Sequence, residues 1–422
     1  MVQSVRGMRD VLPDEARRWR SVEDRIKYLM LGYGYEEIHL PLLEATELFS
    51  RGVGEGTDIV EKEMYTLTDQ EGSGITLRPE GTASCVRALQ EHGLLFNQTQ
   101  RVFYSGPMFR YERPQKGRYR QFYQIGAEVF GAGGAEVDAE LISMCYRLWC
   151  DLGIDRRVHL ELNTLGSSSV RKRYREALVT YLTPLIDQLD EDSQRRLSRN
   201  PLRILDSKNP QTQALLEDAP VMSAFLDEES VANYERLKEL LNQLQVPYQQ
   251  NDRLVRGLDY YTDTVFEWVT TDLGSQGTIC AGGRYDGLVE MLGGKPTPGS
   301  GYAIGLERVL LLHELDHAER EPRSADVYCC VVDPAQHGWA MHFIEQLREL
   351  APDLRIRLHA GGGKLKNQLK RADQTGAQWA LIAGDSEVTN NRVAVKFLRT
   401  DQAQVEMGLN ELAAFLNNAI QS

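Results

Sequence analysis

The chain has 422 residues, of which 42% are hydrophobic, 26% charged and 8% aromatic. These are ordinary values for a globular protein and exclude a disordered, collagen-like or coiled-coil chain. At roughly 100 to 200 residues per domain, the length predicts two to four domains. The 48 basic and 61 acidic side chains give a net charge of −13. A general nucleic-acid coat is therefore excluded, because non-specific binding depends on summed positive charge, although a local basic stripe is compatible with this balance.

The sequence contains no apolar segment of the length that crosses a membrane, and its first residues lack the apolar core of a signal peptide. We therefore expect a cytoplasmic protein that does not enter a membrane. The six cysteines form no CxxC pair and two of them are adjacent. This spacing suits neither a disulfide framework nor a zinc knuckle, so we expect reduced and mostly buried thiols.

The first elements are predicted from residues 14–30 and 38–43. Apolar residues recur every three or four positions in 14–30, just after Pro13, and predict an amphipathic helix. Residues 38–43 are an apolar run interrupted by Pro41. Because proline cannot donate to a β-ladder, we expect this strand to lie or end at a sheet edge.

Residues 100–130 predict a long antiparallel hairpin, since two alternating segments flank the polar loop ERPQKGRYR. Alternation on the second strand gives one face the apolar character of a core; this face carries Tyr123, Ile125, Ala127 and Val129. The opposite face carries Phe122, Gln124, Gly126, Glu128 and Phe130. An amide and a carboxylate between aromatic side chains are typical of the floor of a polar pocket.

The remaining chain predicts a helical insertion and a second domain. Residues 168–250 are charged and helical in composition, whereas strand-like sequence resumes at Thr264 and Gly277. A polar linker, DHAEREPRSAD, precedes a final block of alternating strands and helices. We therefore expect one domain over residues 1–320, containing the insertion, and an α/β domain over 325–422.

Two basic clusters are candidate binding sites. The hairpin loop gathers Arg110, Arg113, Lys116, Arg118 and Arg120 beside the single acid Glu112. Basic side chains at the mouth of a pocket can bind a polyphosphate, and carboxylates inside the same pocket can bind a cationic group of a substrate. The segment GGGKLKNQLKR, residues 361–371, has four basic residues and no acid. It is either the solvated start of a helix or an edge that contacts anions or RNA.

The HELDH run at residues 313–317 matches the HExxH pattern of zinc proteases. It lies at a predicted helix end beside the linker, and no clear third ligand follows it. We interpret its histidines as solvated residues that favour the helix dipole when protonated. A zinc hydrolase is the alternative, and it would lose activity with a zinc-selective chelator.

Several segments together resemble the class II histidyl-tRNA synthetases. Pro41 fits motif 1, FRYERPQKGRYRQF at 109–122 fits motif 2, and GLER at 305–308 fits motif 3. RGLDYY at 256–261 and AGGRYDGL at 281–288 resemble the two signatures peculiar to the histidine enzymes. RPEGT at 78–82 and TDIVEKEMY at 57–65 extend the resemblance, which runs from the N-terminus through the final domain.

The resemblance implies an α+β fold with an antiparallel catalytic sheet, flanking helices, a helical insertion over the acceptor end of tRNA and a C-terminal α/β anticodon-binding domain. It implies a histidine–tRNA ligase that converts L-histidine and ATP to histidyl-adenylate and pyrophosphate, then transfers the histidyl group to the 3′ end of tRNA(His). Magnesium is expected with ATP, held mainly by phosphates. A homodimer is expected, with the motif 1 helix and the Pro41 strand at the interface.

The resemblance also assigns roles to individual residues. The expected catalytic residues are Arg110 at the α-phosphate, Arg308 at the γ-phosphate, and Arg256 between the histidine carboxylate and the α-phosphate. Glu112 and Arg118 join Arg110 and Arg308 in binding ATP. The expected histidine-binding residues are Glu80, Thr82 and Gln124 at the ammonium group, Glu128 and Tyr261 at the imidazole, and Arg256 and Tyr260. The expected tRNA-binding residues are Arg113, Lys364, Lys366 and Lys370.

One rival function shares the fold. A non-catalytic regulatory subunit of a phosphoribosyltransferase resembles the catalytic core but lacks the last domain and has eroded signatures. Arg110, Arg256, Arg308 and residues 325–422 are all present here. Their presence favours the enzyme.

Overall fold

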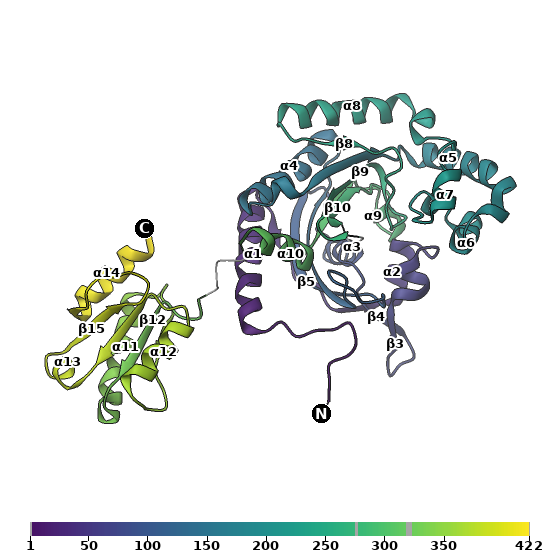
Figure 1. Ribbon diagram of the computed structural model, residues 1–422. Helices are drawn as coiled ribbons and strands as arrows, with labels where there is room; N and C mark the ends of the chain where they lie inside the picture. The colour runs from purple at the N-terminus through teal and green to yellow at the C-terminus, as the bar shows by residue number, and fades with distance from the viewer. Residues whose placement is uncertain (1, 275–276, 318–322, 422) are drawn as a thin grey trace. The chain divides into compact units, whose positions relative to one another are not determined.

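The computed structural model describes residues 2–274, 277–317 and 323–421 (Figure 1). The chain divides into two compact units, the larger over residues 1–12 and 19–317 and the smaller over residues 13–18 and 318–422. A search of the described residues finds no helix that is both long and apolar enough to cross a membrane. All six cysteines are free thiols; Cys150 is exposed and the other five are buried.

Eight strands of the larger unit form one sheet in the order β1-β5-β6-β11-β10-β9-β7-β8. The inner strands pair antiparallel, whereas β1 and β8 add to the edges in parallel. The strands are β1 (Glu36–Glu37), β5 (Gln100–Phe109), β6 (Gln121–Phe130), β7 (His159–Thr164), β8 (Gln249–Gln250), β9 (Thr262–Val269), β10 (Thr278–Arg284) and β11 (Gly299–Gly305). The predicted hairpin is confirmed as β5 and β6, which pair along their whole length.

Helices pack on both faces of this sheet (Figure 1). The helices on the first face are α1 (Pro13–Gly32), α4 (Ala135–Asp151), α8 (Glu228–Gln243) and α10 (Leu306–His317). Ile125, Ala127 and Val129 of β6 are fully buried against them, as the alternation predicted. The second face packs against α3 (Thr82–Glu91) and α9 (Leu288–Met291), and α2 (Thr46–Val53) contacts both of these helices. The second face is therefore the one on which the polar side chains of β6 can form a site.

The predicted strand at residues 38–43 is wrong. β1 ends at Glu37, and β2 (Leu43–Ala45) begins a separate sheet in the order β2-β4-β3, with β3 at Tyr65–Thr68 and β4 at Gly74–Leu77. Between β1 and β2, the carbonyls of Leu40 and Pro41 accept hydrogen bonds from Arg78 Nη1 at 3.0 and 3.4 Å. A side chain thus binds these carbonyls in place of a neighbouring strand, and Pro41 has no N–H to donate.

Residues 168–243, all of which the structure describes, are helical. They form α5 (Ser168–Leu182), α6 (Glu191–Arg199), α7 (Pro210–Leu215) and α8, with short 3₁₀ turns between them. Each α-helix begins after a side chain that caps its free backbone N–H groups; the caps are Ser167, Asp190, Asn209 and Asp227. These local signals explain why a strongly charged sequence forms helices here.

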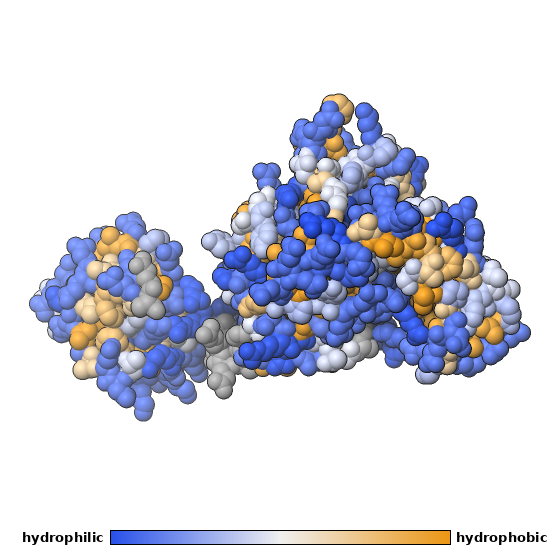
Figure 2. Space-filling view, turned by 90° about the horizontal axis from the view of Figure 1, so that it is seen from above, coloured by the Kyte–Doolittle hydropathy of each residue, from blue (hydrophilic) through white to orange (hydrophobic). Residues whose placement is uncertain are grey.

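The smaller unit contains a five-stranded sheet in the order β13-β12-β14-β15-β16. Its strands are β12 (Val327–Val331), β13 (Ile356–Leu358), β14 (Trp379–Ala383), β15 (Arg392–Phe397) and β16 (Val405–Gly408). One face packs against α11 (His337–Leu350) and α14 (Leu409–Gln421), and the other against α12 (Leu365–Gln374); α13 (Asp385–Thr389) is a short helix before β15. Hydrophilic residues cover most of the surface in the view of Figure 2, with hydrophobic residues in patches.

Candidate active site

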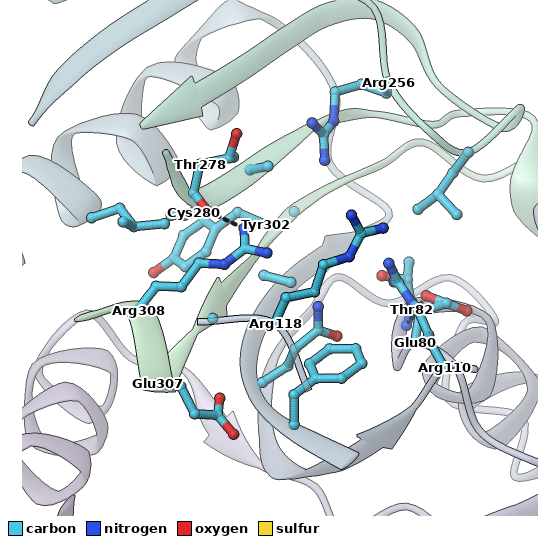
Figure 3. Close-up of a pocket in the computed structure, with 18 of the residues that line it drawn as sticks. Glu80, Thr82, Arg110, Arg118, Arg256, Thr278, Cys280, Tyr302, Glu307 and Arg308 are labelled. Atoms are coloured by element: carbon cyan, nitrogen blue, oxygen red, sulfur yellow. Dashed lines mark hydrogen bonds between the residues drawn. The ribbon is translucent and has the colours of Figure 1, made fainter. Parts of the chain in front are cut away.

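A pocket of about 180 Å³ opens on the face of the large sheet that carries α3 (Figure 3). Its walls come from β6, the hairpin loop, residues 78–82, residues 256–261, β10 and the start of α10. It brings together residues that are far apart in the sequence. The predicted site residues that line it are Glu80, Thr82, Glu112, Gln124, Arg110, Arg118, Arg256, Tyr260, Tyr261 and Arg308.

Two arginines are fixed on opposite sides of the pocket by backbone carbonyls. Arg308 Nε donates to the carbonyl of Gly117 at 3.0 Å, and its Nη1 donates to the carbonyl of Thr278 (Figure 3). Arg110 Nε donates to the carbonyl of Pro79 at 2.8 Å. Burial lowers the pKa of Arg308, so its charge is poorly solvated in the pocket. An anion between these guanidinium groups would relieve this cost.

Arg256 is held by a chain of side-chain contacts that the sequence did not reveal. Its Nη1 pairs with Glu267, and the other oxygen of Glu267 accepts from Thr278 Oγ1 at 2.7 Å. Its guanidinium lies over the ring of Tyr261, 5.6 Å from the centroid. In the described chain, Arg256 Nε is buried without a hydrogen-bond partner. The side chain is therefore oriented by Glu267 and keeps one donor for a ligand.

A second polar end of the pocket is formed by Glu80, Thr82 and Gln124. The oxygens of Glu80 accept the backbone N–H groups of Thr82 and Ala83 at 2.7 and 2.9 Å, at the start of α3. Burial raises the pKa of Glu80. Gln124 Oε1 is a buried acceptor for which the described residues supply no donor. An ammonium group here would supply donors that these oxygens can accept.

Glu128 lies below the pocket and not in its lining. Its carboxyl is fully buried and accepts hydrogen bonds from Thr82 Oγ1 at 2.8 Å, from Tyr104 Oη at 3.0 Å and from Tyr285 Oη. Burial raises the pKa of Glu128 to about 8. The structure thus places Glu128 behind Thr82, so its predicted contact with an imidazole requires Glu128 to exchange one of these partners.

Tyr104 and Tyr285 were missed as site residues. Tyr285 belongs to AGGRYDGL, so the signature contained it without indicating its contact. Tyr104 pairs with Gly126 across the hairpin, and the glycine leaves room for its ring. A glycine opposite an aromatic residue in the hairpin register was the signal that could have identified Tyr104.

The predicted tRNA-binding residues lie outside this pocket. Arg113 is exposed on the hairpin loop. Lys364, Lys366 and Lys370 are exposed in the smaller unit, at the start of α12 and along it. Gly361, Gly362 and Gly363, which precede them, all have positive φ. The segment therefore presents cations after a sharply turning loop.

The described residues contain no group of three or more histidine, cysteine or acidic side chains that could hold a metal ion. The HELDH run ends α10, and the side chain of His317 lies outside the described residues. In the pocket, Glu112 pairs with Arg118 and offers carboxylate oxygens. This donor set fits a magnesium ion that is bound chiefly by substrate phosphates, which needs only one or two carboxylates.

Two family models match this chain. A model described as histidyl-tRNA synthetase matches residues 7–309. A model described as anticodon binding domain matches residues 326–419. Together they account for both compact units.

Solved structures are similar along the whole chain. Histidyl-tRNA synthetase from S. aureus, solved without ligands, is 36% identical, with a TM-score of 0.81, 99% of this chain covered and 100% of the other. Histidyl-tRNA synthetase from Nostoc sp. PCC 7120 is 21% identical, with a TM-score of 0.73 and 99% of each chain covered. A Bacillus halodurans protein described as an ATP phosphoribosyltransferase regulatory subunit/histidyl-tRNA synthetase is 20% identical, with a TM-score of 0.65, 91% of this chain covered and 99% of the other. The last two similarities concern the fold alone.

Proposed function

Because this chain belongs to the histidyl-tRNA synthetase family, we propose that the pocket on the large sheet binds L-histidine and ATP and is where they react. The chain is a histidine–tRNA ligase of α+β fold with a C-terminal anticodon-binding domain. The observation that carries the assignment of the pocket is the meeting of Arg110, Arg256 and Arg308 in one cavity with the polar cluster around Glu80.

The first step is an in-line attack of a histidine carboxylate oxygen on the α-phosphorus of ATP, which releases pyrophosphate. Two negative groups must approach each other, so catalysis depends on positioning and on neutralising charge. Arg256 neutralises charge between the histidine carboxylate and the α-phosphate. It suits this role because Glu267 orients it and its Nε has no protein partner among the described residues. Arg110 and Arg308 take the α- and γ-phosphates, with Arg118 and Glu112 beside them.

The polar cluster positions histidine for this attack. Glu80, Thr82 and Gln124 hold the ammonium group, while Glu128 and Tyr261, with Tyr260, recognise the imidazole. Gln124 and Glu128 are four residues apart on β6, about 13 Å at about 3.3 Å per residue. Side chains that lean toward each other can therefore contact opposite ends of one amino acid.

We infer that Mg²⁺ accompanies ATP, with Glu112 as the carboxylate near the phosphates. When bound, it neutralises part of the charge on the triphosphate and on the departing pyrophosphate. The test is exchange of labelled pyrophosphate into ATP. Exchange should require histidine and Mg²⁺ together and should stop with EDTA; exchange that persists without divalent metal would contradict this inference.

The second step transfers the histidyl group to the terminal ribose of tRNA(His). We propose that residues 1–320 carry out both chemical steps, with Arg113 contacting the tRNA. Residues 325–422 bind the anticodon, with Lys364, Lys366 and Lys370 facing the RNA. Their exposure and like charge support this assignment, because phosphate contacts are made by unburied cations.

We also propose a cytoplasmic homodimer. Tyr28 and Leu31 of α1 are 74% and 57% exposed, and Leu42 and Leu43 are 43% and 44% exposed beside Pro41. Large apolar side chains that are exposed to solvent are typical of a protein interface. Light scattering at micromolar concentration should give the mass of two chains, and a monomer would contradict the proposal. The cytoplasmic location follows from the substrates, because ATP and tRNA are used there in protein synthesis.

A further inference from the structure

The chain before α1 lies against the hairpin loop between β5 and β6. Residues 2–12, all of which the structure describes, belong to no helix or strand. Met8 N donates to the carbonyl of Val5 at 2.9 Å, which closes a turn. The carbonyl of Gly7, inside this turn, accepts the backbone N–H of Arg120 at 2.8 Å, and Arg120 is the last loop residue before β6. The N-terminal segment is therefore bound to the end of the loop through the backbone.

Gly7 fits this place because it has no side chain. Its φ is +85°, in the left-handed region that favours glycine. A Cβ atom here would lie 2.8 Å from Cγ of Arg120 and 2.9 Å from Cγ of Pro114. A bridge between Gln115 and Arg118 marks the tip of the loop, so Pro114 precedes the tip and Arg120 follows it. The segment thus packs across both arms of the loop.

Arg9 extends this contact to residues that line the pocket. Its guanidinium lies over the ring of Tyr119, 4.9 Å from the centroid, and Tyr119 is part of the pocket wall. A guanidinium this close to an aromatic face is attracted to it. Burial raises the pKa of Glu307, another lining residue, to about 7, and the positive charge of Arg9 opposes this rise. Arg9 is therefore attracted to two residues of the pocket wall.

Two supports flank the loop residues that face the pocket. The start of α10 holds the loop at Gly117, and the N-terminal segment holds it at Arg120. The two residues between these supports, Arg118 and Tyr119, both line the pocket. The carbonyl of Arg120 also accepts the backbone N–H of Arg110 at 2.9 Å. The support at Arg120 therefore extends to both arginines that the loop contributes to the pocket.

We propose that Gly7 and Arg9 are positioning residues for ATP, because they fix the end of the hairpin loop and with it the side chains that bind the triphosphate. The inference rests on the proposed function. Arg110 and Arg118 can hold phosphates in a productive arrangement only while the backbone keeps their guanidinium groups in place. A displacement of about 1 Å caused far from the chemistry can cost up to about 100-fold in rate.

The contact should affect ATP more than histidine. Thr82 and Gln124, which we assign to the histidine ammonium group, lie in α3 and in β6. β6 pairs with β5 on one side and with β11 on the other, so Gln124 is held independently of the loop. Loss of the N-terminal contact should therefore raise the KM for ATP and spare the KM for histidine.

The first test compares two glycine substitutions in the full chain. Gly7→Ala places a Cβ atom against the loop, whereas a Cβ at Gly72, in the turn between β3 and β4, would meet no described atom within 4 Å beyond its chain neighbours. Gly72 has a φ of +88°, so the two variants share the same backbone strain. In pyrophosphate exchange, Gly7→Ala should raise the KM for ATP by roughly 10-fold and leave the KM for histidine within about 2-fold. Gly72→Ala should change neither constant.

The second test concerns the contact with Tyr119. Arg9→Gln and Arg6→Gln each remove one positive charge from the same segment, and Arg6 is exposed. Arg9→Gln should raise the KM for ATP by roughly 3-fold or more, because the attraction between the guanidinium and the ring is lost. Arg6→Gln should leave it unchanged. Equal effects of the two variants would overturn the role of Arg9.

Equal changes in Gly7→Ala and Gly72→Ala would overturn the inference, since backbone strain alone would explain them. Equal rises of both KM values in Gly7→Ala would also overturn it, because general disruption would then be the cause. If urea unfolding shows that Gly7→Ala folds poorly, Arg9→Gln should still raise the KM for ATP, and an unchanged value would overturn the inference.

Calorimetric titration with ATP alone separates this inference from the proposed function. If the wild type bound ATP but gave no exchange with histidine, the proposed function would fail. A weaker Kd for ATP in Gly7→Ala than in Gly72→Ala would still support the positioning role of the segment. Equal Kd values in these two variants and the wild type would overturn it, whatever the exchange reaction shows.

Discussion

At the residue scale, Arg256 is the side chain most closely tied to the chemistry. It lines the pocket, is oriented by Glu267 and keeps a buried donor unpaired among the described residues. Arg256→Ala should slow histidine-dependent pyrophosphate exchange by about 100- to 1000-fold, the usual effect of losing one preorganised charge contact in a transition state. Arg253→Ala is the control, since Arg253 is exposed and donates to the carbonyl of Leu216. Full turnover in Arg256→Ala would make Arg256 a structural residue.

We assign Glu128 to the imidazole, although three hydroxyl groups donate hydrogen bonds to its carboxyl in this structure. Glu128→Gln should therefore raise the KM for histidine far more than the KM for ATP. A site built for a polar group discriminates strongly, because a mismatched ligand leaves buried groups unpaired. Steady-state exchange kinetics with each substrate varied in turn measure the two constants. An unchanged KM for histidine would remove Glu128 from the histidine site.

Glu128 should also make stability depend on pH. The folded protein raises the pKa of this carboxyl from 4.5 to about 8, so between these values the folded state binds more protons than the unfolded state. Its contribution to the free energy of unfolding is complete below about pH 4.5 and is lost as the pH rises through about 8. Urea unfolding should show a larger decline from pH 5 to pH 9 in the wild type than in Glu128→Gln. Equal declines would refute the shifted pKa.

Sequence alone indicated much of this site, because its arginines, Glu80 and Gln124 lie in short motifs. The side chains that contact these residues in the folded protein could not be predicted from motifs. Glu267 meets Thr278 through the pairing of β9 with β10, which the motifs do not encode, and it also pairs with Arg256. Tyr104 depends similarly on the register of the hairpin. Partners that meet across strands thus require the fold to be known.

At the scale of elements, the β5–β6 hairpin depends on Gly126. A Cβ atom at this position would lie 2.3 Å from Cζ of Tyr104. Gly126→Ala should therefore displace the Tyr104 ring from Glu128, lower the free energy of unfolding by about 1 to 3 kcal/mol and raise the KM for histidine. Urea unfolding and exchange kinetics measure the two effects.

Gly32→Ala provides the matched comparison, because nothing lies within 4 Å of a Cβ at that position. This substitution at the end of α1 should leave the KM for histidine unchanged. If Gly126→Ala behaved the same way, close packing of Tyr104 against β6 would not be needed for the site.

Regular elements followed from the sequence where one local pattern was strong. The hairpin, α1 and the helices after Ser167 have clear alternation, helical periodicity or caps. Residues 38–43 were predicted wrongly, because their apolar character is strand-like while Arg78, 38 residues after Leu40 and 37 after Pro41, binds the carbonyls of these two residues. The short strands β13 and β16 were missed, since three or four residues give too little alternation to recognise.

At the scale of the whole molecule, the two compact units predict that the two reaction steps can be separated. Residues 325–422 carry none of the side chains assigned to histidine or ATP. A chain that lacks them should keep measurable adenylate formation and lose most of its aminoacylation efficiency through weaker tRNA binding. In the full chain, neutralising Lys364, Lys366 and Lys370 should flatten the salt dependence of tRNA affinity. Unchanged charging after truncation, or full salt dependence in the triple variant, would contradict the role of this domain.

The most direct test of the account is pyrophosphate exchange measured with each of the twenty amino acids in turn, in the presence of ATP and Mg²⁺. The pocket joins three arginines for the carboxylate and phosphates to two tyrosines for an imidazole, and the buried carboxyl of Glu128 lies behind it. We therefore expect exchange with histidine well above that with every other amino acid. Equal exchange with another amino acid, or none in folded protein, would contradict it.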